Sequence, residues 1–298
     1  LCDALVARGD AVVCLDDLST GSRENVAHLL DHDRFTLVVT NVSESVELPD
    51  AGPVDAVCNL ASPASPPAYL ARPFDTLAVG SEGTRRLLEL TRRHGARFLM
   101  ASTSEVYGDP TVHPQVESYR GNVDPTGPRS VYDEAKRFSE SLTMAMHRMH
   151  GVDVGIVRIF NTYGPRLSAG DGRVVSNFIV QALRGDPLTV YGDGSQTRSL
   201  CYVEDEVRGL VALLDSSLVG PVNIGNPDER TMLDLARFVL EVTGSASEVV
   251  FEPLPTDDPT RRCPDITLAR RELGWEPRIG LREGIERTIH YFADRVQD

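Results

Sequence analysis

Lysine is almost absent from this chain of 298 residues. Lys136 is the single example, and the other 29 of the 30 basic side chains are arginines. The formal charge is -14, and the sequence has no basic stripe of the kind that nucleic-acid-binding domains carry. The composition therefore argues against a nucleic-acid partner, and local groups of arginines would have to bind any anion.

Other absences exclude further classes of protein. No apolar run approaches the roughly 20 residues that a membrane-spanning helix needs, so we expect no membrane partner. The five cysteines are scattered without CxxC spacing, and the seven histidines form no HExxH pair. We therefore expect reduced thiols, a cytoplasmic location and no metal ligands.

The beginning of the chain also lacks an expected motif. Residues 1–10 already have the pattern of an amphipathic helix, and the first β-rich run, "AVVCLD", follows it. In dinucleotide-binding units a glycine-rich turn lies about 20 residues before the acidic residue that ends such a run. We therefore expect an N-terminal strand and a glycine-rich turn before Leu1. Whether a targeting segment also precedes Leu1 is left open.

Short apolar runs alternate with helical patterns in the first half of the chain. The runs predict strands at 11–16, 35–39, 55–61, 97–102 and 154–160, and the helical patterns cover about 75–94 and 130–150. Short apolar runs bounded by Gly, Pro and Asp suit strands that are buried on both faces. Strands alternating with helices predict an α/β fold with a doubly wound, parallel, Rossmann-like sheet.

The pattern loosens after about residue 165. Helices are expected near 174–185, 204–215, 231–243, 265–273 and 281–296, with short strands at "LTVYG" and "PVNIG". We predict a sheet domain over 1–165 plus about 197–216, and a smaller substrate-binding lobe over about 166–196 and 217–298. A ligand is expected outside the carboxyl ends of the strands, facing that lobe.

Asp16 ends the first predicted strand. In a dinucleotide-binding unit, an acidic residue at this place hydrogen-bonds the adenosine ribose hydroxyls and favours NAD over NADP. An aspartate that only caps a turn is the alternative, and Asp16 alone does not decide between them.

The single lysine lies four residues after Tyr132, so the two side chains share one face of a helix. A cation beside a tyrosine favours the phenolate, which can act as a base, and an ammonium can also hydrogen-bond ribose hydroxyls. With 8 tyrosines in 298 residues, a randomly placed lysine would follow one at this spacing roughly 3% of the time. We therefore favour a catalytic pair over a surface lysine.

Polar side chains also stand where ligands are expected. Thr103, Ser104 and Glu105 follow the strand at 97–102, where a hydroxyl can orient a substrate alcohol and a carboxylate can handle protons. Arg173 and Arg198 lie in Gly/Asp-rich loops, and Arg262 lies in another loop of the second lobe. Guanidinium groups suit a diphosphate or a carboxylate. A polar turn and solvated surface arginines are the alternatives.

Long ordered motifs match one family. "NLASPASPPAYL", "ASTSEVYGDP", "VYDEAKR", "RIFNTYGPR", "DGRVVSNFI", "LTVYGDGSQTRS" and "NIGNP" occur in this order. From about residue 10 to 294 the sequence resembles the nucleotide-sugar branch of the extended short-chain dehydrogenase/reductases, and within it the UDP-glucuronate decarboxylases (UDP-xylose synthases). The resemblance implies an NAD-dependent carboxy-lyase. Such an enzyme oxidises C4 of UDP-glucuronate with tightly held NAD, releases C6 as CO2 and returns the hydride to give UDP-xylose.

The resemblance also implies residue roles. Tyr132 would be the base, Lys136 would lower its pKa and hold the nicotinamide ribose, and Thr103 would anchor O4. Ser104 and Glu105 would position the ring and carboxylate, and Arg262 would bind the diphosphate or the sugar end. Further NAD contacts are expected from Asp16, Asp17, Ser19, Thr20, Gly21, Asn41, Val42, Leu60, Ala101, Thr162 and Arg173. Further substrate contacts are expected from Asn161, Arg173, Val175, Ser176, Asn177, Phe178, Val190, Tyr191, Gly192 and Arg198.

Several positions separate this chain from other members of the superfamily. The 4,6-dehydratases carry Asp-Glu after the threonine, whereas this chain has Ser104-Glu105. Asn41 replaces a usual aspartate, and Ala78 and Gly80 stand where relatives carry Lys and Asn, which bears on substrate preference. Relatives dimerise through the two helices expected here at 75–94 and 130–150, so a homodimer is expected. A 4-epimerase, a 4,6-dehydratase and a truncated, non-catalytic NAD-fold binding protein remain alternatives.

Overall fold

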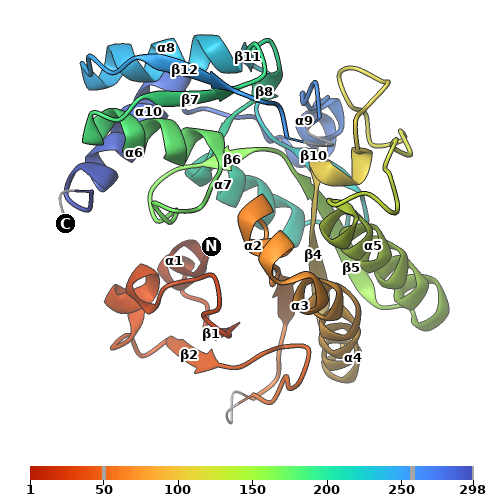
Figure 1. Cartoon of the computed structure of the whole chain (residues 1–298). Helices are drawn as coiled ribbons and strands as arrows, with labels where there is room; N and C mark the ends of the chain where they lie inside the picture. Colours follow the sequence, from red (N-terminus) through yellow and green to blue (C-terminus); the bar gives the residue numbers. More distant parts are fainter. Residues whose placement is uncertain (49–51, 256–258, 297–298) are drawn as a thin grey trace.

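Four parallel strands form the centre of the protein in the computed structural model, which describes residues 1–48, 52–255 and 259–296. Their order is β10-β5-β4-β3 (Figure 1). They span Val222–Ile224, Asp153–Ile159, Arg97–Thr103 and Ala56–Asn59, respectively. Every neighbouring pair in this sheet is parallel, so the predicted α/β fold is confirmed.

Helices cover both faces of this sheet, and the alternation of side chains on β4 shows why. Phe98 and Met100 point into a core shared with α4 (Thr84–His94) and with β5. Leu99 points into the opposite core, formed with α7 (Val203–Leu214) and α9 (Thr267–Leu273). Because successive strand residues face opposite sides, an uninterrupted apolar run is what a doubly covered strand requires.

Helix α5 (Ser130–His150) carries the predicted catalytic pair and lies beside β4 and β5. It coincides with the predicted helix at 130–150. Its end is set by Gly151, whose φ of 66° places it in the left-handed region that glycine adopts without strain. The helical pattern at 75–94 forms three consecutive segments, α3 (Pro73–Ala78), the π-turn η2 (Val79–Gly83) and α4.

The first two strands form a separate parallel pair, β1 (Val12–Asp16) with β2 (Phe35–Val39). The doubly wound order 3-2-1-4-5-6 has one strand between the second and the fourth. Here β2 and β1 correspond to the third and second strands of that order. Strands β3, β4 and β5 correspond to its fourth, fifth and sixth strands. The described residues do not fill the place of strand one. Both strands of the pair are only partly buried, so burial on both faces was a wrong expectation for them.

The second lobe packs around a core of its own. Its members come mainly from α6 (Val174–Arg184), β7 (Leu188–Tyr191), α8 (Met232–Thr243) and α10 (Leu281–Ala293). In Figure 1 these helices lie at the upper left, across from α4 and α5. The remaining segments are α1 (Cys2–Arg8), η1 (Arg23–Leu29), α2 (Pro66–Ala71), η3 (Ser104–Tyr107), β6 (Thr162–Tyr163), β8 (Thr197–Ser199), β9 (Cys201–Tyr202), β11 (Glu229–Thr231) and β12 (Val249–Glu252).

One part of the expected division into lobes needs correction. Strand β10, from the "PVNIG" run assigned to the second lobe, pairs with β5 and extends the central sheet. Helix α9 also belongs with the central sheet, since Ala269 packs in the same core as Val222. A three-residue strand carries too little pattern to reveal which sheet it joins, because that choice is made by distant partners.

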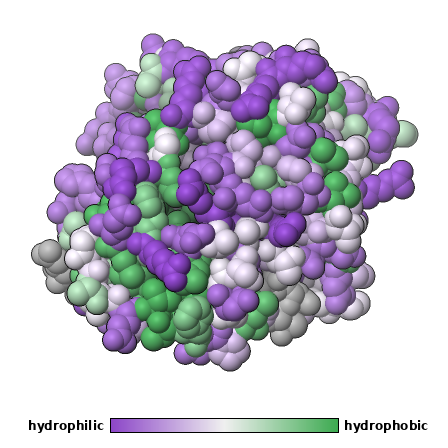
Figure 2. Space-filling model, turned by 90° about the horizontal axis from the view of Figure 1, so that it is seen from above, coloured by the Kyte–Doolittle hydropathy of each residue, from purple (hydrophilic) through white to green (hydrophobic). Residues whose placement is uncertain are grey.

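The surface agrees with the charged composition. Figure 2 shows a mostly hydrophilic face, with apolar residues gathered in an area at its lower left. Within the described residues, no helix combines the length and apolar character needed to cross a membrane.

An almost buried ion pair joins α5 to the sheet. Arg158 of β5 donates through Nε and Nη2 to the two carboxylate oxygens of Glu140, each at 2.8 Å. The side chains are only 11% and 14% exposed. Ser102 Oγ of β4 donates to the same carboxylate at 2.6 Å. The carboxylate therefore connects α5, β4 and β5 at one point.

We expect Glu140→Gln to lower the free energy of unfolding by about 3–5 kcal/mol, because it leaves a buried guanidinium without its counter-charge. Equilibrium unfolding in urea measures the change. Glu241→Gln is the matched control, since its pair with Arg282 is 64% and 53% exposed and should contribute less than about 1 kcal/mol. Equal losses in the two variants would contradict the role assigned to burial.

Candidate active site

Tyr132 and Lys136 project from one face of α5 toward the carboxyl end of β4. They are 6% and 5% exposed, respectively. Lys136 Nζ donates to Ala101 O at 3.0 Å and lies 5.8 Å from the centre of the Tyr132 ring. An ammonium has three donors, and the carbonyl of Ala101 takes one. The other two can serve hydroxyl groups of a ligand at this edge of the sheet.

Burial controls the protonation of both groups. Burial raises the pKa of Tyr132 to about 12, although a hydrogen bond with Thr103 acts in the opposite direction. Burial also lowers the pKa of Lys136 to about 8. In the protein alone the phenol is therefore protonated at neutral pH, and its conversion to phenolate needs further positive charge beside the ring.

A second tyrosine, Tyr69 of α2, stacks on Tyr132. The ring centres are 5.1 Å apart and the planes are inclined by 8°. Tyr69 is 1% exposed, and burial raises the pKa of its hydroxyl. Sequence reasoning missed this contact. The "SPASPP" run marks the segment, but neither its spacing nor its composition shows that the tyrosine beyond it reaches α5.

Glu105 lies between two arginines at the beginning of η3. Its Oε2 accepts from Arg129 Nη2 at 2.9 Å and from Arg262 Nη2 at 2.8 Å. Burial alone would raise the pKa of Glu105, but the charges of the two guanidinium groups outweigh it and hold the pKa at about 2. The carboxylate is therefore ionised throughout the neutral range.

Arg262 lies at the same turn. It is 1% exposed, and its Nη1 donates to Ser104 O while Nη2 reaches Glu105. Burial lowers the pKa of the guanidinium. The structure therefore puts Arg262 beside the Thr103–Glu105 turn, and its predicted contact with a sugar or diphosphate stays a prediction. Arg129 was not predicted, because nothing in its sequence surroundings distinguishes it from other arginines.

Asp133, next to Tyr132, is a further polar group that sequence reasoning missed. It lines a cavity of about 290 Å³ together with Arg129, Gly108 and Asn122. Its buried Oδ1 has no hydrogen-bond partner among the described residues. Burial and the nearby charge of Glu105 raise the pKa of Asp133 to about 7. Two neighbouring carboxyl groups therefore differ strongly in acidity.

The predicted NAD contacts lie in or after parallel strands. Asp16 ends β1, and the run from Asp17 to Gly21 follows that strand. Asn41 and Val42 follow β2, and Leu60 follows β3. Ala101 lies near the carboxyl end of β4. Asp16 Oδ1 accepts Leu18 N at 2.7 Å, and a Cβ on Gly21 would lie 3.5 Å from the Asp16 carboxylate. Because parallel strands end at the same edge, these groups can surround an adenosine ribose. The chain fits the adenosine part of NAD.

The predicted substrate contacts divide into two kinds. Val175, Ser176, Phe178 and Val190 are buried, and Val175, Phe178 and Val190 pack in the core of the second lobe. Asn177, Tyr191, Gly192 and Arg198 are less buried, and Tyr191 is 44% exposed. Arg173, at the beginning of α6, pairs with Asp171 at 2.8 Å. Each of these roles remains a prediction.

Two polar groups lie at the junction of sheet and second lobe. Asn161 follows β5, and its buried Oδ1 has no partner among the described residues, which leaves an acceptor for a ligand. Thr162 begins β6 and donates to Phe160 O at 2.8 Å. Asn161 is therefore better suited to ligand binding than Thr162.

The departure at position 80 has a structural counterpart. A Cβ added to Gly80 would lie 2.7 Å from Ala135 Cβ and 3.1 Å from Ala135 O. Helix α5 therefore approaches the π-turn η2 too closely for any larger residue at this position. Gly80 O also accepts from Ser139 Oγ at 2.7 Å, which fixes the contact.

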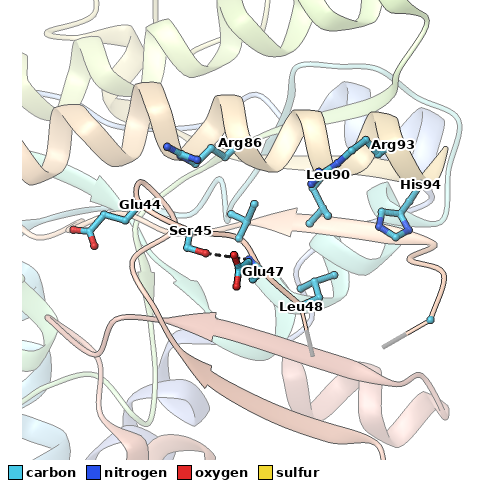
Figure 3. A pocket seen from close by; sticks show the side chains of 10 residues that line it. Glu44, Ser45, Glu47, Leu48, Arg86, Leu90, Arg93 and His94 are labelled. Carbon is cyan, nitrogen blue, oxygen red and sulfur yellow. Dashed lines mark hydrogen bonds between the residues drawn. The ribbon is translucent and has the colours of Figure 1, made fainter. Parts of the chain in front are cut away.

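A larger cavity of about 740 Å³ lies elsewhere, between the 44–48 loop and α4 (Figure 3). Arg86, Arg93 and His94 line one side of it, and Glu44 and Glu47 line the other. It contains none of the residues predicted to act in catalysis. Size alone therefore does not identify the functional site here.

Comparisons with known proteins show the family of the chain. Residues 1–225 match the NAD dependent epimerase/dehydratase family. UDP-glucuronic acid decarboxylase 1 of Arabidopsis thaliana is 52% identical over 296 residues, covering 99% of this chain and 67% of the relative. UDP-glucuronic acid decarboxylase 1 of Xenopus tropicalis is 49% identical over 297 residues, covering 100% and 70%.

A solved structure has the same fold. UDP-glucuronic acid 4-epimerase from Bacillus cereus, in complex with UDP-glucuronic acid and NAD, superposes with a TM-score of 0.85 at 26% identity, covering 98% of this chain and 94% of the other. The matches extend over almost all of the sequence, and the chain therefore belongs to the NAD dependent epimerase/dehydratase family, in the branch represented by its UDP-glucuronic acid decarboxylase relatives.

Proposed function

We propose that the protein decarboxylates UDP-glucuronate to UDP-xylose, with NAD reduced and reoxidised in each turnover. The observation that carries the proposal is the 52% identity to a UDP-glucuronic acid decarboxylase over 99% of this chain. The grouping of Tyr132, Lys136 and Thr103 next to the Glu105–Arg262 pair supports it, because these groups supply the required acid–base and charge functions.

The chemistry requires few steps at the sugar. NAD held by Asp16, Asp17 and Lys136 would supply the hydride acceptor for the oxidation of C4 and the hydride donor for the reduction after CO2 has left. A C4 ketone is β to the C6 carboxylate, so the C5–C6 bond can break with its electrons held in an enolate. A proton then adds at C5. The net reaction consumes one proton and releases one CO2, and orientation and charge placement supply most of the catalysis.

Tyr132 removes the proton from the C4 hydroxyl and later returns it. Thr103, which is hydrogen-bonded to Tyr132, orients the same hydroxyl. Lys136 holds the nicotinamide ribose through donors that Ala101 does not use, and its charge stabilises the phenolate. Stacking by Tyr69 fixes the ring between these contacts.

Ser104, Glu105 and Arg262 position the sugar ring and its carboxylate. Arg262 is already paired with Glu105, so its charge is partly compensated before substrate binds. That arrangement suits a group that must release CO2, because an uncompensated cation would hold the carboxylate in its ground state. Asn161, Arg173, Tyr191 and Arg198 hold the UDP portion in the second lobe, and Asp16 and Asp17 hold the adenosine ribose.

The two lobes bind different ligands. The sheet domain binds NAD, and the second lobe binds the nucleotide sugar. We assign 1–165 and about 197–216 to the NAD-binding domain together with β10 and α9, because β10 pairs with β5 and Ala269 of α9 packs in the same core. The substrate lobe comprises about 166–196 and the rest of 217–298.

We also propose that the protein acts in the cytoplasm as a homodimer. The five cysteines are free thiols, in keeping with a reducing compartment. Neighbouring helices carry exposed apolar side chains: Phe74 of α3 is 83% exposed and Phe138 of α5 is 50% exposed. Apolar groups on adjacent helices favour burial in a helix-to-helix contact between subunits.

The reaction is tested by incubating the purified full-length protein with UDP-glucuronate and NAD and following CO2 and the sugar nucleotide. We expect equal amounts of CO2 and UDP-xylose. Formation of UDP-galacturonate without CO2 would identify a 4-epimerase. Loss of water would identify a dehydratase, and a protein that binds no NAD and yields no product would be a non-catalytic binding protein.

Lys136→Arg should lower turnover at least about 100-fold although the charge is kept. The larger guanidinium does not fit the buried space beside Ala101, and it disturbs Tyr132. Steady-state kinetics and bound NAD content measure the effect. Arg148→Lys, an exposed exchange on the same helix, is the control and should leave turnover unchanged. Full activity of Lys136→Arg would refute the proposed pair.

Phe74→Glu combined with Phe138→Glu should convert the dimer to a monomer, because it puts charges into the proposed subunit contact. Light scattering coupled to size-exclusion chromatography gives the mass. Phe251→Glu is the control, since Phe251 is 55% exposed on β12 in the second lobe. A wild-type protein that elutes as a monomer, or a double variant that stays dimeric, would contradict this arrangement.

A further inference from the structure

His113, Glu229 and Cys263 meet at the edge of the second lobe from three separate segments. The imidazole nitrogen, the carboxylate oxygen and the thiol sulfur lie within 4.8 Å of one another. His113 belongs to the loop after η3, Glu229 begins β11, and Cys263 follows Arg262. His113 and Glu229 are 116 positions apart in sequence, so no spacing motif could indicate this cluster.

Contacts around the cluster hold the three donors in place. His113 Nε2 is 3.1 Å from Glu229 Oε2, and Thr197 Oγ1 donates to the other carboxylate oxygen. Gln115, which is fully buried, ties the loop to the Cys263 segment. Its N donates to Cys263 O at 2.8 Å, and its Oε1 accepts Cys263 N at 2.9 Å. The donors are therefore assembled by the fold before any ion binds.

The donor set suits zinc. Zinc binds imidazole nitrogen, carboxylate oxygen and thiolate sulfur at roughly 2.0–2.3 Å, which puts tetrahedral ligands roughly 3.4–3.6 Å apart. The His113–Glu229 separation of 3.1 Å is already in this region, and the limit of 4.8 Å leaves about 1 Å to be closed. The cluster is also accessible, since His113 faces solvent while Cys263 is only 4% exposed.

We propose that His113, Glu229 and Cys263 form a binding site for a zinc-class divalent cation, with the fourth coordination position taken by water. The formal charge of -14 attracts cations to the protein. The three donors are distinct from the groups assigned to the decarboxylation, and the site does not depend on that activity.

A bound ion would join the 113–115 loop, β11 and the segment after Arg262. Because the folded chain assembles the donors and the unfolded chain does not, the ion binds the native state preferentially and stabilises it. Arg262 directly precedes Cys263, so the site also fixes the backbone of the arginine that pairs with Glu105.

The test uses the full-length protein, treated with a chelator and titrated with Co2+ and then with Zn2+. We expect one Co2+ per chain, with a thiolate charge-transfer band and the visible bands of tetrahedral cobalt. Zn2+ should displace the cobalt and raise the melting temperature. Cys263→Ser should lose the charge-transfer band, and His113→Ala should weaken Zn2+ binding at least about tenfold.

Thiols outside the cluster provide the controls. Cys2 and Cys14 are hydrogen-bonded to each other and could bind cobalt themselves, and Cys58 lies on β3. Cys14→Ser and Cys58→Ser should both keep the band and the affinity. A band that persists in Cys263→Ser, or an unchanged Zn2+ affinity in the exposed variant His113→Ala, would overturn the proposal. So would the absence of stoichiometric binding to the wild type.

Discussion

One buried ammonium organises the centre of this protein. The side chain of Lys136 extends from α5 to the carboxyl end of β4, where Ala101 O accepts its hydrogen bond at 3.0 Å. Tyr132, one turn earlier on the same face of the helix, also points at the carboxyl edge of the sheet. Removing the ammonium from water costs free energy and lowers its pKa to about 8. Because this pKa is close to neutral pH, the protonation of Lys136 responds to charged groups placed beside it. Such a response is useful at a site that exchanges protons.

The charged groups around that centre form two separate systems. Glu140, Arg158 and Ser102 make an almost buried network between α5 and the strands β4 and β5, in which the carboxylate and the guanidinium neutralise each other. Glu105, by contrast, shares one oxygen between two arginines at the open edge of the sheet. The first arrangement joins elements of the fold. The second places two guanidinium groups next to the turn that carries Thr103.

The sequence was most informative where one element contains the whole signal. Strand β4 and helix α5 were predicted because their patterns are long, and the Tyr132–Lys136 pair was visible because one helical turn sets its spacing. Tyr69, Arg129 and Asp133 were not found, since each acts through a neighbour from another segment. The assignment of β10 failed for the same reason, because three residues do not reveal which strand they will join. Contacts between distant segments are set by packing of the whole chain and leave no local pattern.

The difference between Glu105 and Asp133 shows why such contacts matter for chemistry. Both are carboxyl groups, both are largely buried, and burial raises the pKa of each. Two guanidinium groups reverse the effect at Glu105 and hold its pKa at about 2, whereas burial, together with the negative charge of Glu105, raises the pKa of Asp133 to about 7. At neutral pH the site therefore contains a permanent anion on η3 and, on the neighbouring helix α5, a carboxyl group that exchanges its proton. A residue type alone specifies neither state, and the position of two arginines decides between them.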